Sequence, residues 1–214
     1  RITTRRGNSI EYSYLPDGTK LSQAYGVPLK TLLAPLAEEH DLSADVSSEQ
    51  IDSLAYMNRQ EMSKMSLMGY TEYSGNIIYE NGKLIKVLFP GGYCTFEKGI
   101  NNPTFHYFTQ DHLGNNRIVL NEDGTVEQIT HYYPFGGAFN DAGLNPEFQQ
   151  YKYNGKELNR TLGLDTYDYG ARQYFSALPM WDRIDPKCEE DYSVSPYAYC
   201  RNNSMKFIDN EGEK

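Results

Sequence analysis

Cysteine, long hydrophobic runs and positive charge are all scarce in this sequence. Its three cysteines, Cys94, Cys188 and Cys200, are odd in number and lack CxxC spacing, so neither a zinc site nor a disulfide framework is predicted. Each is expected to be a packed or free thiol, although one pair could bridge in an oxidising compartment. No apolar run approaches the roughly 20 residues that span a membrane, so no transmembrane helix is expected.

The charge balance opposes nucleic-acid binding. The 214 residues include 20 Lys and Arg against 29 Asp and Glu, which gives a net charge of −9. Because nucleic-acid affinity depends on basic side chains that neutralise phosphates, nucleic acid is excluded as the main partner. The sequence also lacks a GxSxG elbow, a P-loop and a dinucleotide fingerprint. No hydrolase or nucleotide-enzyme class is therefore indicated, and no cofactor is predicted.

Tyrosine is abundant, with 19 Tyr beside 9 Phe and 1 Trp. A tyrosine can bury its ring while its hydroxyl stays on water or on a polar partner. We therefore expect tyrosine to supply much of the hydrophobic core. The alternative is that the tyrosines form a platform for a ligand.

Four stretches share one pattern, in which an aromatic or aliphatic run is followed by an acidic or amide residue, a glycine and a second apolar run. They lie at residues 12–21, 77–84, 107–114 and 118–126. Aromatic and β-branched residues favour strands, and Asn-Gly or Asp-Gly supplies the positive φ angles of a tight turn. The predicted fold class is all-β, as a meandering antiparallel array of β-hairpins that forms an open curved sheet.

The chain divides into three parts. Residues 1–26 hold the first hairpin. Residues 27–69 differ in composition, and a capping box at Ser47 and Gln50 indicates a helical insertion or a mobile linker. Residues 70–214 resume the strand pattern and end in a segment rich in turn-forming and aromatic residues, which predicts a compact C-terminal plug. The chain begins with Arg1, so it is expected to be a piece of a longer polypeptide.

A metal site has one weak candidate. His106 and His112 flank one predicted hairpin beside Asp111, whereas His40 and His131 are scattered. Spacing across a turn seldom converges three ligands, and Asp111 is already suited to bend the chain, so no metal site is predicted.

Eight short motifs follow one another between residues 70 and 212. They are Asp111–Arg117, Tyr132–Gly136, Tyr153–Glu157, Tyr169–Arg172, Asp185-Pro186, Ser195–Tyr197, Asn202-Asn203 and Phe207–Asp209. In this order they resemble the conserved core of the Rhs/YD-repeat family. The resemblance assigns residues 70–214 to an RHS repeat-associated core domain.

The resemblance implies a β-sheet that spirals into a hollow shell in long members and encloses a toxic or effector C-terminal segment. It also implies self-cleavage just beyond the last motif, near residue 212, by an aspartate pair and an upstream arginine. These map onto Asp185, Asp209 and Arg172. Two carboxylates held close cannot both ionise easily, so one can act as acid while the other activates water. A guanidinium can hold the pair or a developing oxyanion.

Simpler roles stay open for the same residues. Asp185 and Asp209 lie 24 positions apart, so they meet only if the chain doubles back. Asp185 could instead be a turn residue before a proline, and Asp209 could cap a local turn. Arg172 could form a salt bridge to a nearby aspartate, Asp165 or Asp168.

The sequence departs from the family pattern at several positions. The family usually continues with Asp-Pro and Gly-Arg-Trp where this chain has Phe175-Ser176 and Pro179–Trp181. Asn210 replaces a proline, and Glu213 stands where a leucine often precedes the cut. Because proline fixes the backbone, its absence is expected to leave Asn210 free to move and to make cleavage slow or absent.

These residues and motifs leave two functions open. The first is a secreted or surface-displayed Rhs-type module whose partner is its own C-terminal effector segment or a secretion or immunity protein. Its only enzymatic activity would be self-cleavage. The second is a non-catalytic adhesion module whose tyrosine-rich sheet binds glycan or protein.

Overall fold

Strands dominate the architecture. The computed structural model describes residues 2–3, 8–28, 65–140 and 149–213. Eleven strands form one sheet, in which each strand pairs with its neighbours in the chain. They are β1 Ile2–Thr3, β2 Ser9–Tyr14, β3 Lys20–Pro28, β4 Met65–Ser74, β5 Ile77–Glu80, β6 Lys83–Phe89, β7 Gly92–Thr95, β8 Thr104–Gln110, β9 Asn116–Asn121, β10 Val126–Tyr132 and β11 Ala138–Asn140.

The C-terminal segment forms a second, smaller sheet with short strands. These are β12 Glu157–Asn159, β13 Thr166–Asp168, β14 Gln173–Phe175 and β15 Met180–Trp181. Four 3-10 turns accompany them, η3 Tyr153–Gly155, η4 Thr161–Gly163, η5 Cys188–Glu190 and η6 Cys200–Asn202. All strand pairs are antiparallel. The predicted all-β meander is confirmed.

The four predicted hairpins form where the turn residues lie. Asn81 and Gly82 adopt φ angles of 50° and 76° between β5 and β6. Asp17 Oδ1 accepts the Thr19 N–H at 2.9 Å in the β2–β3 turn, and Asp123 makes the same 2.9 Å contact with the Thr125 N–H between β9 and β10. These aspartates therefore bend the chain through local side-chain to backbone bonds.

Strands extend into both ends of the segment 27–69. β3 continues to Pro28 and β4 begins at Met65, and these two residues pair with each other. Strand structure thus resumes five residues before Tyr70, because pairing with β3 determines the backbone there whatever the composition. The helix predicted after Ser47 lies outside the described residues, and the three-part division of the chain remains a prediction.

The hydrophobic core lies in the C-terminal segment. Its buried members are Tyr153, Leu158, Tyr167, Tyr169, Tyr174, Trp181, Tyr199 and Cys200. Tyr174 stacks on Tyr199 with ring centroids 4.1 Å apart. Hydroxyls reach backbone acceptors at the core edge, since Tyr174 donates to the Phe135 carbonyl at 2.8 Å and Tyr167 donates to the Gly136 carbonyl at 3.0 Å. The prediction that tyrosine supplies much of the core is confirmed.

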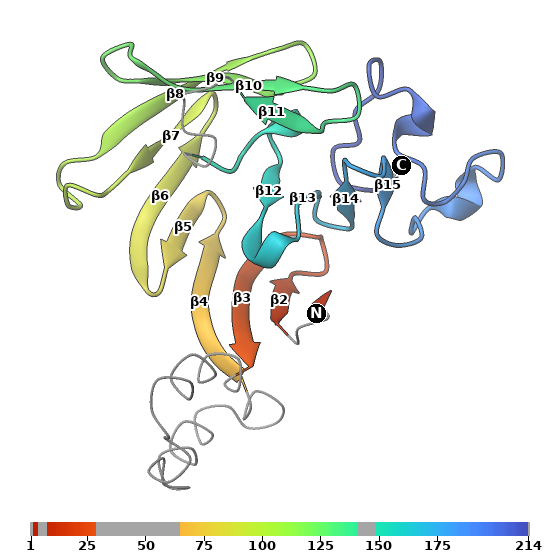
Figure 1. The fold of residues 1–214 in the computed structure, drawn as a ribbon, viewed down its shortest axis with the longest axis horizontal. Helices are drawn as coiled ribbons and strands as arrows, with labels where there is room; N and C mark the ends of the chain where they lie inside the picture. Colours follow the sequence, from red (N-terminus) through yellow and green to blue (C-terminus); the bar gives the residue numbers. More distant parts are fainter. Residues whose placement is uncertain (1, 4–7, 29–64, 141–148, 214) are drawn as a thin grey trace, which may run out of the picture.

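The long sheet curves around the C-terminal segment, so that β12 and β13 lie against its concave side (Figure 1). The contact there is a buried ion cluster. Lys20 of β3 lies 3.0 Å from Glu157 and 3.1 Å from Asp168, and its side chain is 10% exposed. The ammonium also lies 5.1 Å from the ring centroid of Tyr12 and 4.7 Å from that of Tyr73. Ion pairing and cation–π contacts together offset the cost of burying the cation.

A second contact joins the two sheets through asparagines. Asn154 in η3 adopts a φ of 49°, and its N–H donates to Asn115 Oδ1 at 2.7 Å. Its side-chain amide donates to the Leu113 carbonyl at 2.8 Å. The loop before β9 and the turn before β12 therefore hold each other in place.

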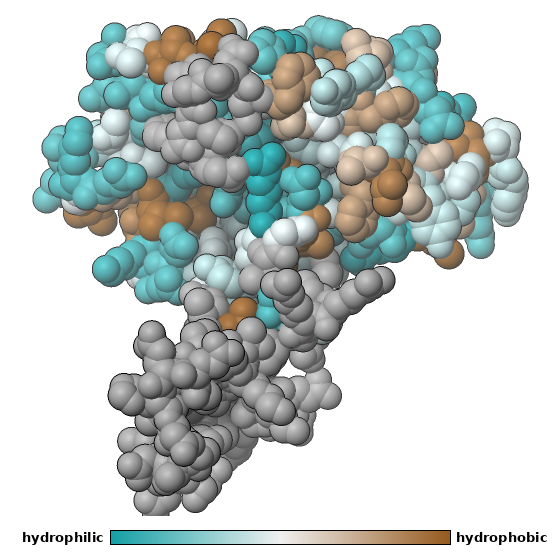
Figure 2. Space-filling view, viewed as in Figure 1, coloured by the Kyte–Doolittle hydropathy of each residue, from teal (hydrophilic) through white to brown (hydrophobic). Residues whose placement is uncertain are grey.

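The face viewed in Figure 2 carries mostly hydrophilic residues, with hydrophobic residues in separate patches. Within the described ranges, no helix is long and apolar enough to cross a membrane.

Lys20→Met should destabilise the protein strongly. The change removes the cation while the carboxylates of Glu157 and Asp168 stay buried, so we expect the free energy of unfolding to fall by about 3–5 kcal/mol. Urea unfolding followed by Trp181 fluorescence measures it. Lys83→Met, at an exposed position of β6, is the control and should change stability by less than about 0.5 kcal/mol. Equal losses in the two variants would contradict the role of the cluster.

Candidate functional site

Arg172 lies at the centre of the candidate site. It follows the turn between β13 and β14, where Gly170 has a φ of 90° and a Cβ would lie 2.9 Å from the Gly18 carbonyl oxygen. The Arg172 side chain is 0% exposed, and its guanidinium carbon lies 4.2 Å from the ring centroid of Trp181. β15 places Trp181 there because it pairs with β14. Burial lowers the pKa of Arg172, and the neighbouring carboxylates act in the opposite direction.

The structure brings the three predicted site residues together. Arg172 Nη2 donates to Asp185 Oδ2 at 2.9 Å and lies 3.4 Å from Asp209 Oδ2. The other expected partners of Arg172 are engaged elsewhere. Asp165 pairs with Arg160 at 3.1 Å, and Asp168 pairs with Lys20. The alternative of a salt bridge from Arg172 to either of these aspartates is therefore wrong.

The chain doubles back through the Ser195–Tyr197 motif. The Pro196 carbonyl accepts the Asp185 N–H at 3.1 Å and Arg172 Nη1 at 3.1 Å. The Trp181 N–H donates to the Tyr197 carbonyl at 3.0 Å. Residues 195–198 thus run beside residues 180–185, which brings Asp185 to the guanidinium. The motif stands out in the sequence, but nothing there predicts a role for the Pro196 carbonyl.

Asp209 caps a local turn, as one reading of the sequence expected, and it also contacts Arg172. While Oδ2 faces Arg172, Oδ1 accepts the N–H groups of Glu211 at 3.1 Å, Gly212 at 2.7 Å and Glu213 at 3.2 Å. The carboxylate therefore caps the terminal loop, residues 209–213, and contacts the guanidinium at the same time. Asp185 is likewise a turn residue, since its Oδ1 accepts the Lys187 N–H at 2.8 Å.

Three successive carbonyls of the terminal loop are also held. Lys156 Nζ donates to the Asn210 carbonyl at 2.5 Å, the Ala171 N–H donates to the Glu211 carbonyl at 3.2 Å, and Arg172 Nε donates to the Gly212 carbonyl. Asn210, which was expected from the sequence to be free to move, thus has a side-chain contact on its backbone carbonyl. The contact lies at the position where the family has a proline ring.

Glu213, at the position where the family often has leucine, is the last residue of this loop. It forms an ion pair with Lys187, which follows Asp185 by two positions. The loop is therefore tied to the Asp185 segment at its end as well as through Arg172.

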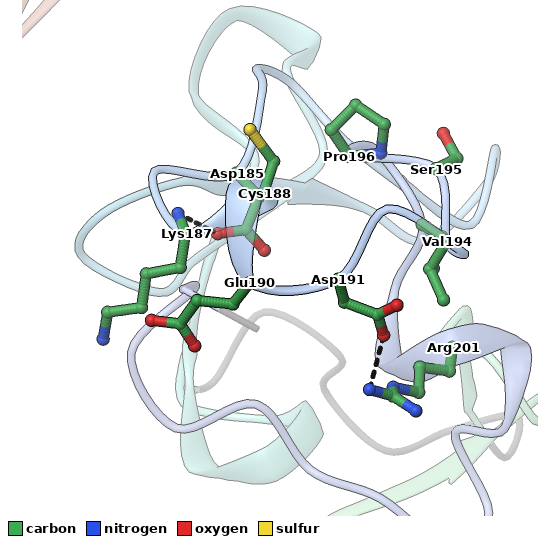
Figure 3. A pocket seen from close by; sticks show the side chains of 10 residues that line it. Asp185, Lys187, Cys188, Glu190, Asp191, Val194, Ser195, Pro196 and Arg201 are labelled. Carbon is green, nitrogen blue, oxygen red and sulfur yellow. Dashed lines mark hydrogen bonds and ion pairs between the residues drawn. The ribbon is translucent and has the colours of Figure 1, made fainter.

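A pocket of about 280 Å³ opens beside Asp185. Figure 3 shows Asp185 and Cys188 on one side of it and the ion pair of Asp191 with Arg201, 2.5 Å apart, on the other. The Asp185 side chain is 13% exposed and that of Asp209 is 4% exposed. Asp185 is thus the carboxylate with access to water.

The Gly212–Glu213 peptide bond is polarised by this arrangement. Its carbonyl oxygen accepts from a buried cation, and its N–H faces the Asp209 carboxylate. Donors aimed at a carbonyl oxygen in a site shielded from water stabilise negative charge that develops there. The geometry is therefore suited to addition of a nucleophile at the Gly212 carbonyl carbon.

Other candidates from the sequence have structural contacts. His106 Nδ1 lies 2.6 Å from Glu127 Oε2, and Asp111 Oδ1 accepts the Leu113 N–H at 3.0 Å. Over the part of the chain that the structure describes, no group of three or more His, Cys, Asp and Glu side chains could hold a metal ion. His40 lies outside that part. All three cysteines are free thiols, and burial raises the pKa of Cys200 to about 11.

Comparison with known proteins points to bacterial toxin subunits. No family model matches the sequence. A toxin subunit of Yersinia entomophaga, YenC2, is 29% identical over 117 residues, which is 53% of this chain and 12% of that protein. A TcdB2-TccC3 crystal structure superposes with a TM-score of 0.65 at 17% identity, over 99% of this chain and 9% of the other. The Tc holotoxin pore of Photorhabdus luminescens gives a TM-score of 0.63 at 16% identity, over 100% and 9%.

These likenesses show a shared fold with part of the TcdB2-TccC3 structures and a sequence relationship to one toxin subunit. The chain spans about a tenth of the length of each of these proteins. Together they support the resemblance to Rhs-type toxin proteins.

Gly212→Ala should be more harmful than the same change in an open turn. Gly212 has a φ of 75°, and a Cβ there would lie 3.1 Å from Arg172 N and from Tyr169 Cβ, whereas Gly82, with a φ of 76°, has nothing within 4 Å. Gly82→Ala is expected to cost about 1–2 kcal/mol of unfolding free energy from backbone strain. Crowding should add about 1–3 kcal/mol at Gly212. Equal costs in urea unfolding would show that the loop does not pack against Arg172 as described.

Proposed function

We propose that this chain is the core segment of an Rhs-type shell that encloses or presents a C-terminal effector segment. We also propose that Asp185, Asp209 and Arg172 form a self-cleavage site near residue 212. The observation that carries the proposal is that one buried guanidinium contacts both carboxylates and the carbonyl oxygen of Gly212. The similarity to toxin subunits supports it.

The environments of the two carboxylates suggest different roles. Asp185 lines the pocket, so it can accept a proton from a water molecule that attacks the Gly212 carbonyl carbon. Arg172 stabilises the negative charge that develops on the carbonyl oxygen. As the bond between Gly212 and Glu213 breaks, the proton held by Asp185 passes to the departing nitrogen of Glu213. Asp209 orients the peptide, because its Oδ1 already accepts three backbone N–H groups.

The fold is consistent with a role as part of a larger container. The long sheet ends at β1 and β11, and a sheet edge can pair with further strands of the same polypeptide. Its concave side already receives the C-terminal segment (Figure 1). In this proposal, the parent protein is secreted or displayed on a surface, and its partner is the effector segment or a secretion or immunity protein.

The adhesion alternative requires tyrosine faces that are available to bind glycan or protein. Six tyrosines are buried in the described part of the chain, Tyr93, Tyr153, Tyr167, Tyr169, Tyr174 and Tyr199, whereas Tyr107, Tyr133, Tyr192 and Tyr197 are exposed. Five of the buried tyrosines belong to the hydrophobic core. Self-cleavage is the function that the geometry supports best, because the Arg172 guanidinium contacts both carboxylates and the Gly212 carbonyl oxygen.

Asp209→Asn should prevent self-cleavage in a polypeptide that is extended beyond Lys214. Intact-mass spectrometry of the purified wild-type polypeptide should show an N-terminal fragment that ends near Gly212, and this fragment should be absent from the variant, because a neutral amide weakens both the loop cap and the ion pair to Arg172. Asp123→Asn is the matched control, since Asp123 makes a similar turn contact far from the site, and it should cleave like wild type. An intact wild-type protein, or normal cleavage of Asp209→Asn, would contradict the proposal.

A further inference from the structure

Lys156 contacts the terminal loop from a different part of the chain. It lies between η3 and β12 in the Tyr153–Glu157 motif. Its ammonium donates to the Asn210 carbonyl at 2.5 Å and lies 5.2 Å from the ring centroid of Tyr169. Asn210 is only two residues before Gly212, whose carbonyl contacts Arg172. A displacement of Asn210 would therefore displace the Gly212 carbonyl from the guanidinium.

The backbone that carries Lys156 is anchored. The Lys156 N–H donates to the Tyr153 carbonyl at 2.9 Å, and its own carbonyl accepts the Lys152 N–H at 2.9 Å. The same turn is bound to the long sheet through Asn154, which contacts Asn115 and Leu113. Lys156 thus connects the terminal loop to a rigid turn that is itself fixed against the loop before β9.

We propose that Lys156 is a positioning residue for self-cleavage, and that its ammonium holds the Asn210 carbonyl so that the Gly212 carbonyl stays on Arg172. The inference rests on the proposed function. It assigns to a lysine the restraint that a proline ring at position 210 would otherwise supply. Lys156 does not touch the reacting atoms, so its effect on the rate is exerted through the loop.

The charge of Lys156 adds a pH dependence to this role. Burial lowers the pKa of Lys156, while Asp209, Asp168 and Glu211 act in the opposite direction. The ammonium is the form that makes a charge-assisted hydrogen bond, which is about twice as strong as a neutral one. The restraint is therefore present below the lowered pKa and weakens as the pH rises through it. The rate of self-cleavage should therefore begin to fall at a lower pH than it would if Lys156 were exposed to water.

The test compares Lys156→Met and Lys156→Arg in the same polypeptide extended beyond Lys214. Lys206→Met is the control, because Lys206 is an exposed lysine near an aromatic ring, 5.3 Å from the centroid of Phe207. The rate of fragment formation, measured by intact mass at several pH values, should fall about 10- to 100-fold in Lys156→Met, as expected for loss of a hydrogen bond from a charged donor. Lys206→Met should keep the wild-type rate.

Lys156→Arg should retain cleavage and move the alkaline decline to higher pH, because a guanidinium stays charged. A purely structural role of Lys156 would not shift the pH profile. If Lys156→Met fails to fold, the Arg variant still decides, since an unshifted alkaline decline would overturn the inference.

Hydrogen exchange of the Gly212 amide separates this inference from the proposed function. In the Asp185→Asn background, Lys156→Met should accelerate exchange at Gly212 at least about tenfold, because the loop loses a hydrogen bond from a charged donor. If Asp209→Asn abolishes cleavage but Lys156→Met changes neither cleavage nor exchange, the role of Lys156 is overturned and the proposed function stands. If the wild type does not cleave, the proposed function fails, and exchange alone decides whether Lys156 holds the loop.

Discussion

The buried guanidinium of Arg172 is the constraint on which the C-terminal architecture depends. A cation withdrawn from water and placed on the Trp181 ring is costly unless its donors are paired. Four acceptors from distant segments satisfy it, the carboxylates of Asp185 and Asp209 and the carbonyls of Pro196 and Gly212. The same contacts place two carboxylates beside one peptide carbonyl. The interactions that make the fold stable thus also assemble the candidate site.

The rest of the molecule fixes this centre in space. The aromatic core surrounds Trp181, and Lys20 ties the long sheet to β12 and β13 through Glu157 and Asp168. Polar contacts between the sheet and the C-terminal segment have preferred directions, and purely apolar contacts do not. Through these contacts, the position of the sheet determines where Asn154, Lys156 and the terminal loop lie. A site built in this way is preorganised by contacts that lie far from it in the sequence.

The hairpins could be predicted because their signals are local, as in the positive φ angles that Asn81 and Gly82 adopt. The start of β4 could not be predicted, because its composition does not indicate a strand and the strand forms by pairing with β3. Asp185 and Asp209 were identified only from the order of motifs, because their contacts with Arg172 span 13 and 37 positions and leave no local periodicity. The Pro196 carbonyl and the Lys156 ammonium were missed. A backbone acceptor has no sequence signature, and an isolated lysine gives no indication of what it contacts.

A double-mutant cycle between Arg172 and Asp209 is the sharpest test of the claim that the C-terminal architecture depends on the buried guanidinium. The free energy of unfolding is measured for the 214-residue chain, for Arg172→Met, for Asp209→Asn and for the double variant. Because the two side chains belong to one buried network, the single changes should be non-additive, with a coupling energy of about 1–3 kcal/mol. Additivity within about 0.5 kcal/mol would contradict that dependence, since it would mean that the guanidinium and the carboxylate stabilise the fold independently.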